Sequence, residues 1–407
     1  MTAKGICTRS AIKTLLGAVG IAMATTTASG EMRGDTIRIG VLTDVTGAYS
    51  ESAGQGSQIA AELAVADMGG SIGGTPVEVV IGDTRNDPDT AVEQARAWHD
   101  EGIDLITGMP GSAVALAVQA FTREQDIATI HIGAGSEQLT GEQCSPVAID
   151  WQYNVRGFTT GLARALAEEN PGGDWYLITL DHPFGHDIRD RLEEVLEDYD
   201  GELLHTQLHP FDQTDFMATM ADALASGADI IAVGNAGTGL VQSIRHAHEL
   251  GVHADADLAS VMTLLQDIRQ VGLYAAADMR FIIPYYWNTD EATRAFAERF
   301  QRRSGSRSSS AQIAVYVSTL HYLKAVEASG HSTGPELVAA MREMEVDDGI
   351  TRNGFIREDG RLVHDMPFVR VRQASEMERA GDYFEILDTM PGAALYGEDP
   401  DPACPFL

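Results

Sequence analysis

The residues of this sequence best suited to chemistry form a short run of small residues that ends in a hydroxyl. Residues 108–112 (Gly-Met-Pro-Gly-Ser) follow an apolar run typical of a buried strand and precede an apolar helical pattern. Ser112 therefore stands where a helix is predicted to begin, beside Gly111. Its hydroxyl and the N–H groups of the helix start are suited to bind an anion. Simple capping of the helix is the alternative interpretation of Ser112.

Two further turns share this small-residue character. Residues 133–136 (Gly-Ala-Gly-Ser) follow the next apolar run, and small side chains at Gly133, Ala134 and Gly135 let a ligand approach the backbone. A tight turn without a ligand is the alternative. Asn235 lies in a glycine-rich turn that exposes backbone N–H groups, although its glycine spacing does not match the dinucleotide-binding fingerprint.

The sequence gives little support for a catalytic site or a metal site. The sequence lacks the phosphate-binding loop and the zinc-protease motif, which argues against an enzyme. His182 and His186 are four residues apart and could face one metal ion. A zinc site needs three or four ligands, and no third ligand is evident, so solvated histidines are the favoured interpretation. We expect no catalytic residue, no cofactor and no metal.

Aromatic side chains gather at the ends of predicted strands and in the connections between them. Tryptophan and tyrosine in such places offer a ligand a large contact area together with a polar group. Packing within a hinge or a core is the alternative, and we expect it to account for part of the set. The candidates are Tyr49, Trp151, Tyr153, Phe184, Tyr285, Tyr286 and Trp287.

Alternating strands and helices must position these residues. Short apolar runs predict buried parallel strands, and the segments between them show helical spacing of apolar residues. The pattern occurs in two series, so the chain of 407 residues is predicted to fold as α/β with two doubly wound parallel-sheet lobes. The predicted strands are residues 36–42, 77–83, 103–108 and 127–132, then residues 175–180, 203–208, 229–233 and 279–285.

Residues 1–28 have the features of a cleavable signal peptide. Lys4, Arg9 and Lys13 form a cationic start, and the apolar stretch that follows is too short to cross a membrane. We therefore expect a periplasmic protein that does not insert into the membrane.

The charge of the chain limits its partners. The formal net charge is −32, with 60 acidic residues against 28 lysines and arginines. Such a surface does not attract nucleic acid or anionic lipid. Attraction of cations is one interpretation of this acidity. Adaptation to salty surroundings, in which salt screens the repulsion, is favoured because the acidic residues are spread along the whole chain.

Cysteine usage predicts one disulfide. Cys7 lies in the signal peptide, which leaves Cys144 and Cys404 in the mature chain. In an oxidising compartment an even pair predicts a bridge, which here would tie down the C-terminal end. Two buried free thiols are the alternative.

Several segments, taken in order, resemble the leucine/isoleucine/valine-binding protein family, the type I periplasmic solute receptors of ABC importers. The matching segments are residues 103–112, 127–136, 180–186 (Leu-Asp-His-Pro-Phe-Gly-His) and 314–325. The resemblance covers essentially the mature chain and implies two lobes joined by three crossovers, with the ligand between them. The expected lobes are residues 29–135 with 288–350 and residues 136–287 with 351–407.

The resemblance also implies roles for individual residues. Ser112 matches the hydroxyl that binds the ligand carboxylate, and residues 133–135 match the backbone donors. Phe184 matches an aromatic residue that covers the ligand from the second lobe.

One departure from the family bears on the ligand. Amino-acid receptors place an acid for the ligand ammonium in the loop that matches residues 261–264, which holds Thr263 but no acid. Asp267 is the nearest acid and is predicted to belong to the next helix. An apolar or aromatic carboxylate therefore fits better than an amino acid, although cation–π capture of an ammonium is an alternative. The residues expected at the far end of the ligand are Phe184, Trp151 and either Tyr286 or Trp287.

The expected function is that of a monomeric solute-binding protein that delivers a small organic carboxylate to the permease and ATPase of an ABC importer. A receptor for branched-chain amino acids or amides is one alternative. A ligand-sensing domain that reports to a membrane sensor is another.

Overall fold

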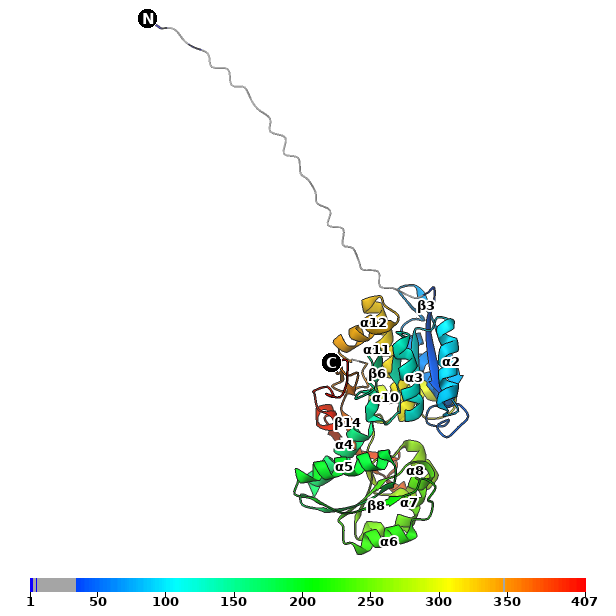
Figure 1. The fold of residues 1–407 in the computed structure, drawn as a ribbon, viewed down its shortest axis with the longest axis vertical. Coiled ribbons are helices and arrows are strands. Elements are labelled where there is room, and N and C mark those ends of the chain that lie inside the picture. Colours follow the sequence, from blue (N-terminus) through cyan, green and yellow to red (C-terminus); the bar gives the residue numbers. More distant parts are fainter. Residues whose placement is uncertain (3–4, 6–33, 347) are drawn as a thin grey trace.

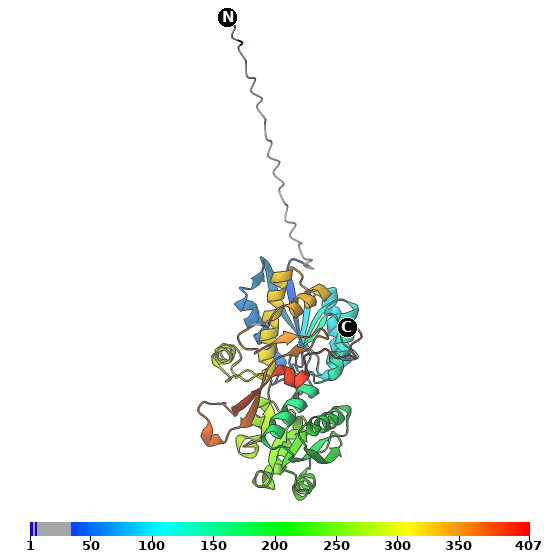
Figure 2. The same ribbon diagram turned by 90° about the vertical axis from the view of Figure 1, so that its left-hand side faces the viewer.

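The computed structural model describes residues 1–2, 5, 34–346 and 348–407, and Figures 1 and 2 show two lobes. The predicted signal peptide lies outside the described residues except for Met1, Thr2 and Gly5. None of the helices in the described part of the chain is long and apolar enough to cross a membrane.

The first lobe contains a six-stranded sheet in the order β2-β3-β1-β4-β5-β6. All neighbours pair in parallel except β2 and β3. The strands are β1 (Ile37–Thr43), β2 (Ser71–Ile72), β3 (Thr75–Asp83), β4 (Leu105–Gly108), β5 (Ala128–His131) and β6 (Ala148–Asp150). Apolar side chains on both faces of β1 are buried, as the near-continuous apolar run predicted.

Helices cover both faces of this first sheet. One face and its helices share a single apolar cluster, and a second cluster fills the other face. The helices of the first face are α1 (Gly54–Asp67), α10 (Glu291–Ser304), α11 (Ser310–Ser329) and α12 (Gly334–Glu343). Those of the second face are α2 (Pro88–Asp100) and α3 (Ser112–Glu124). Helix α2 begins because the Asp87 carboxylate accepts a hydrogen bond from the Thr90 N–H at 2.8 Å.

The second lobe contains a seven-stranded sheet in the order β15-β14-β11-β10-β9-β7-β8. The predicted doubly wound lobe is confirmed, with the addition that β14 and β15 form an antiparallel edge of its parallel sheet. Residues 372–383 join β14 to β15 without a crossover α-helix, and a connection of this kind suits an antiparallel pair. The strands are β7 (Asp174–Leu180), β8 (Glu202–His209), β9 (Ile230–Gly234), β10 (Asp257–Ser260), β11 (Arg280–Ile282), β14 (Met366–Val371) and β15 (Phe384–Met390).

Helices also cover both faces of the second sheet. Residues of α4 (Val155–Glu169), α5 (Pro183–Glu197) and α13 (Gly392–Tyr396) share one apolar cluster with one face. The opposite face packs against α6 (Met217–Ala225), α7 (Gly237–Glu249), α8 (Leu265–Val271) and α9 (Leu273–Ala276).

The chain passes between the lobes three times, as the resemblance implied. The crossovers lie between β6 and α4, between β11 and α10, and between α12 and β14. The third crossover contains a short antiparallel pair, β12 (Phe355–Ile356) and β13 (Leu362–Val363).

The expected lobe boundaries need two corrections. Strand β6 pairs with β5, so the first sheet continues to Asp150 instead of ending before residue 136. The end of the chain lies against the first lobe, because Cys404 is bonded to Cys144 in the loop between β5 and β6. The predicted disulfide is thereby confirmed, with its Cα atoms 5.4 Å apart. A short segment belongs to the lobe that it contacts. The order of segments along the sequence does not reveal these contacts.

Candidate functional site

The turn between β4 and α3 has a backbone that requires glycine. Gly108 has a φ of 112°, and the following Met109 has a φ of 61°. A Cβ on Gly108 would lie 2.5 Å from the Leu42 carbonyl oxygen of the neighbouring strand. Because a side chain there would collide with backbone, the small residue allows α3 to begin directly beyond the strand end.

The start of α3 offers unused hydrogen-bond donors. Gly111 is the N-cap, so the interpretation of Ser112 as a simple capping residue is wrong. No side chain caps the helix, and the half-buried Ser112 hydroxyl has no hydrogen-bond partner among the described residues. The N–H groups of a helix start carry partial positive charge. This end of α3 is therefore suited to an anion.

The turn after β5 lies beside the start of α3. A Cβ on Gly133 would lie 3.7 Å from the Cα of Pro110, the residue before Gly111. Within the described part of the chain, the N–H groups of Gly133, Ala134 and Gly135 have no hydrogen-bond partner. The Gly133 carbonyl accepts the Tyr153 hydroxyl at 3.1 Å, which fixes the turn. The structure thus brings the two predicted donor loops together.

The strand ends of the second lobe use their polar groups internally. The Asn235 Nδ2 donates to the Ser243 Oγ at 2.8 Å, and the Asn235 Oδ1 lies 2.7 Å from the His209 Nε2. Asn235 is fully buried in this network. Phe184 is half-buried in the first turn of α5 and packs against the apolar cluster of that face. His186 lies 3.0 Å from Asp181.

Two polar residues after β10, Thr263 and Asp267, differ from this pattern of internal hydrogen bonding. The Thr263 hydroxyl is buried and has no partner within the described residues. Asp267 lies in the first turn of α8, as predicted, and its Oδ2 accepts the Leu264 N–H at 2.8 Å. Burial, assisted by the nearby Glu51 carboxylate of the first lobe, raises the pKa of Asp267 to about 6, although the hydrogen bond from the Leu264 N–H acts to lower it.

The tryptophans and tyrosines of the crossovers are packed into the molecule. Trp151 is completely buried against His321, with ring centroids 5.4 Å apart. The Tyr286 hydroxyl donates to Asp382 at 2.8 Å, and the Trp287 Nε1 donates to the Gly381 carbonyl at 3.2 Å. These rings belong to the apolar cluster that continues from one lobe into the other. Hinge packing is therefore the role that their contacts support.

Tyr49 and Tyr153 lie closer to the donor loops. Tyr49 is half-buried after β1, and burial together with the nearby Asp44 carboxylate raises its pKa. Tyr153 stacks on Phe158, with ring centroids 4.5 Å apart, while its hydroxyl bonds to Gly133. Both rings thus lie where the strand-end loops of the first lobe approach the second lobe.

The two lobes touch at ion pairs on the same side as these loops. Glu51, in the loop after β1, lies 3.3 Å from Arg269 of α8. Glu137, after β5, lies 3.4 Å from Arg156 of α4. The strand-end loops of the first sheet therefore face helix α4 and helix α8 of the second lobe, and α8 follows the carboxyl end of β10.

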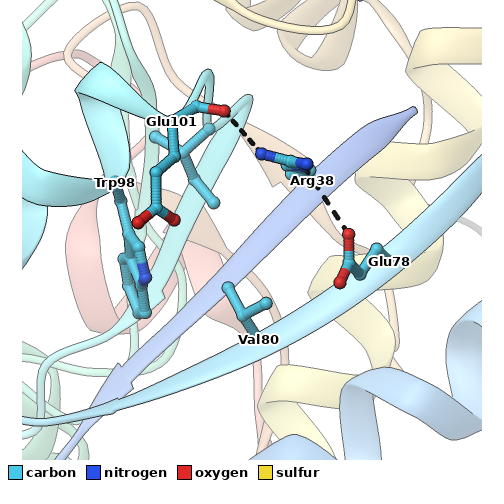
Figure 3. A pocket seen from close by; sticks show the side chains of 6 residues that line it. Arg38, Glu78, Val80, Trp98 and Glu101 are labelled. Carbon is cyan, nitrogen blue, oxygen red and sulfur yellow. Dashed lines mark hydrogen bonds and ion pairs between the residues drawn. The ribbon is translucent and has the colours of Figure 1, made fainter. Parts of the chain in front are cut away.

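A small cavity of about 120 Å³ lies beside β1, β3 and α2 of the first lobe (Figure 3). Trp98 and Val80 line it, and Arg38 bridges its rim by donating to the Glu101 carbonyl at 2.6 Å and pairing with Glu78 at 3.6 Å. The Arg38 cation at this cavity is already paired with Glu78. The cavity itself lies toward the amino ends of the strands. It is therefore separate from the donor loops.

Comparisons with known proteins identify the family to which this fold belongs. Residues 36–376 match the model of the periplasmic binding protein family. This chain belongs to that family. A comparison with curated proteins returns no match.

Solved structures agree with this assignment. A periplasmic binding protein from Burkholderia mallei is 34% identical, with a TM-score of 0.82 over 91% of this chain and 99% of that one. A branched chain amino acid ABC transporter periplasmic ligand-binding protein from Burkholderia xenovorans is 30% identical, with a TM-score of 0.86 over 89% and 97%. An ABC transporter solute-binding protein from R. palustris in complex with benzoate is 18% identical, with a TM-score of 0.72 over 88% and 97%, and shares the fold.

Sequence reasoning missed three residues of this periplasmic binding protein that face the region between the lobes. Glu51 and Arg269 join the lobes, and Gln152 lies at the first crossover beside the Gly133 turn. Gln152 follows a strand end directly, which is the signal that drew attention to Ser112 and Gly133. Its burial depends on α11, far along the sequence, and no local pattern reveals that.

Proposed function

We propose that this periplasmic binding protein is an extracytoplasmic receptor for a small organic carboxylate, which it delivers to the permease and ATPase of an ABC importer. The observation that carries the proposal is the set of unpaired donors at the start of α3 and in the turn after β5. N–H groups and a hydroxyl that converge on one place favour a carboxylate over a neutral group, because hydrogen bonds to a charged group are stronger. The cationic and apolar features of residues 1–28 support export to the periplasm.

In the proposed complex the ligand lies between the lobes. Ser112, Gly111 and the N–H groups of residues 133–135 bind its carboxylate, and Phe184, Tyr49 and Thr263 contact the remainder. Closure of the two lobes about the three crossovers then encloses it. The buried rings of Trp151, Tyr286 and Trp287 support the crossovers, and Asn235 supports the second lobe; none of these four is part of the proposed contact set.

An amino acid is the second candidate ligand, and Asp267 favours it. This carboxylate is half-buried and interacts with Glu51 of the other lobe. When ionised it could accept the ammonium of an amino acid whose carboxylate occupies the first lobe. The branched chain amino acid protein from B. xenovorans and the benzoate complex from R. palustris bear names that point to these two ligand classes in the same fold.

A panel of matched carboxylates and carboxamides tests the proposal. Thermal shift and calorimetry would compare benzoate with benzamide, 4-methylpentanoate with 4-methylpentanamide, and leucine with leucinamide. A ligand that binds only the folded protein at a hundred times its Kd stabilises it by about 2.7 kcal/mol. We expect binding by at least one acid and none by its amide. Equal binding of an acid and its amide would contradict a carboxylate site.

A further inference from the structure

The C-terminal tail joins the two lobes once more after the three crossovers. It begins in α13, which packs in the second lobe, and it ends on the first lobe, where Figure 2 places the C-terminus. A tail that is fixed at both ends adds a fourth connection to the hinge. The contacts at each end and along the tail show how firmly it is held.

The start of the tail is seated in the second lobe. Helix α4 carries Gly157 and Gly161 one turn apart, and the side chains of α13 fill the space beside them. A Cβ on Gly157 would lie 2.3 Å from the Tyr396 ring, and a Cβ on Gly161 would lie 2.6 Å from the Leu395 side chain. Both side chains of α13 are buried. Because glycine leaves room for this close approach, α13 is fixed against α4.

The end of the tail is bonded covalently to the first lobe. Cys404 forms its disulfide with Cys144, in the loop between β5 and β6, and both residues are buried. Helix α3 holds that loop. The Gln119 Nε2 donates to the Gln143 carbonyl at 2.7 Å, and the Arg123 Nη1 donates to the Cys144 carbonyl at 3.3 Å. The tail is therefore attached to an anchored part of the first lobe.

A buried ion pair of the third crossover holds the tail between its two ends. Arg357 and Asp359 are paired at 2.5 Å. The Arg357 Nη1 donates to the Tyr396 carbonyl at 2.8 Å. The Asp401 N–H donates to the Asp359 Oδ2, also at 2.8 Å. Both members of the ion pair thus bind the backbone of the tail.

This ion pair belongs to the first lobe. The turn that carries it lies at the edge of the first sheet, where the Asp150 N–H of β6 donates to the Gly360 carbonyl at 2.9 Å. Arg361 of the same turn forms a buried ion pair with Asp150. The span between the lobes is short and uncovered: residues 397–399 are exposed, and residues 398–400 form no hydrogen bond with any described residue.

The covalent end makes this connection permanent. Hydrogen bonds break and re-form as the lobes move apart, whereas the disulfide stays closed. The chain from Tyr396 to Cys404 spans at most about 28 Å even when fully extended. We infer that residues 397–404 are a strap that limits how far the lobes open and how freely they rotate about the crossovers. A receptor with a narrower open ensemble loses less conformational entropy when it closes on its solute.

Distances between the lobes test the strap without any ligand. Glu93→Cys in α2 and Ala221→Cys in α6 place spin labels at exposed positions of the first and second lobes, for pulsed electron paramagnetic resonance. The test variant carries six Gly/Ser residues inserted between Glu398 and Asp399. This insertion lengthens the strap by up to about 20 Å and keeps the disulfide. We expect the distance distribution to broaden and its mean to increase by several ångströms.

Two controls separate a longer strap from a weaker fold. Removal of residues 405–407 shortens the chain but leaves the strap and its disulfide intact. The same Gly/Ser insertion between Gly73 and Gly74 lengthens an exposed turn within the first lobe, between β2 and β3. Both controls should give the wild-type distribution.

A second variant covers the case in which the lengthened tail does not fold. Cys144→Ser combined with truncation after Gly397 removes the strap altogether, and we expect a distribution at least as broad as that of the insertion variant. Wild-type distances in the folded strap variants would show that the tail does not limit opening, and the inference would be wrong. Broadening in either control would overturn it too, because a loosened fold would then explain the change. None of these results depends on the solute, so the carboxylate site stands or fails separately in the binding assays.

Discussion

The strand-end loops of the two lobes face each other but use their polar groups in different ways. In the first lobe, the start of α3 and the turn after β5 keep a hydroxyl and several N–H groups unpaired within the described residues. In the second lobe, both ends of the Asn235 amide form hydrogen bonds, one with Ser243 and one with His209. One lobe therefore has donors prepared for a ligand, and the other has a polar network that holds its own loops in place.

This difference has a consequence for the order of binding. A carboxylate can satisfy the donors of the first lobe without any movement of the second lobe. The second lobe contributes mainly Phe184, the Thr263 hydroxyl and the half-buried Asp267. We therefore expect ligand to bind the open first lobe and the second lobe to close over it, which is the usual hinge motion of two-lobed receptors.

The largest effect is expected from the disulfide, which belongs to the first lobe alone. Replacing Cys144 and Cys404 by serine should lower the stability of the first lobe by about 3 kcal/mol, because the bridge restricts the unfolded chain over a long loop. Hydrogen exchange should rise in the loop between β5 and β6 and at the chain end. Equal loss of protection in β7 and β9 would show that the lobes do not unfold separately. Free alkylation of both cysteines in native periplasmic material would contradict the bridge itself.

A pair of substitutions tests the contrast directly. Ser112→Ala should weaken carboxylate binding by about 2 kcal/mol, the scale of a hydrogen bond to a charged group. It should leave the melting temperature nearly unchanged, because the Ser112 hydroxyl bonds to no described residue. Asn235→Ala should do the reverse and lower the melting temperature, since it removes the partner of the buried His209 Nε2 and one of the hydrogen bonds of the buried Ser243 hydroxyl.

Calorimetry and thermal melts on both variants separate the two roles. If Ser112→Ala binds like wild type, the donors of the first lobe do not hold the ligand. If Asn235→Ala weakens binding at a temperature where the variant is folded, the network of the second lobe is part of the ligand site after all.

These contrasts also explain what the sequence could predict. Local rules find the loops of the first lobe. Residues 108–112 and 133–136 combine strand ends with small residues, and such residues indicate a turn whose backbone is open to close contact. They also place Asp267 in a helix. The burial of Asp267 and the position of Gln152 depend on segments far away in the chain, and local rules cannot supply them. Ser310, which holds Gln152, lies 158 residues later.

The aromatic candidates show the same limit. A ring in a crossover can turn toward a ligand or toward the hinge, and the sequence does not decide between these. Trp287 and Tyr286 turn toward Gly381 and Asp382 in the hairpin between β14 and β15. That hairpin was not predicted, so its contacts could not be anticipated. Antiparallel edge strands of a mostly parallel sheet carry no helix between them, and the alternating pattern that revealed the other strands is missing there.

The pH dependence of binding sharpens the role of Asp267. Burial raises the pKa of Asp267 to about 6, so the carboxyl is largely protonated at pH 5 and ionised at pH 7. A simple carboxylate should therefore bind about threefold more weakly at pH 7 than at pH 5, because ionised Asp267 repels it across the site. A 2-amino acid should show the opposite trend. Asp267→Asn should remove either dependence, and calorimetry at several pH values with a constant salt concentration measures it.

The same shift affects stability. The pKa of Asp267 is higher in the folded chain than in the unfolded one, so the folded form binds the proton more tightly. The contribution of Asp267 to stability is therefore favourable at low pH and is lost as the pH rises through 6. Asp267→Asn should stabilise the protein relative to wild type at pH 7 and have little effect at pH 4. An unchanged difference between the two pH values would contradict the burial of an ionisable group here.

The smallest effect is expected from the pair that joins the lobes, Glu51 and Arg269. Both side chains are partly exposed, and exposed ion pairs contribute about 0.2–1 kcal/mol. Arg269→Gln should weaken ligand binding by about twofold in dilute buffer, because closure then brings Glu51 toward Asp267 without a compensating cation. The loss should disappear near 0.5 M NaCl, where screening acts over about 4 Å. A double-mutant cycle with Glu51→Gln isolates the pair, since the second substitution should restore the affinity that the first one loses. An effect of Arg269→Gln that persists in high salt, or that Glu51→Gln does not reverse, would mean that Arg269 acts on the ligand and not on the contact between the lobes. The second lobe would then contribute a cation to the site, and the assignment of carboxylate binding to the first lobe alone would be wrong.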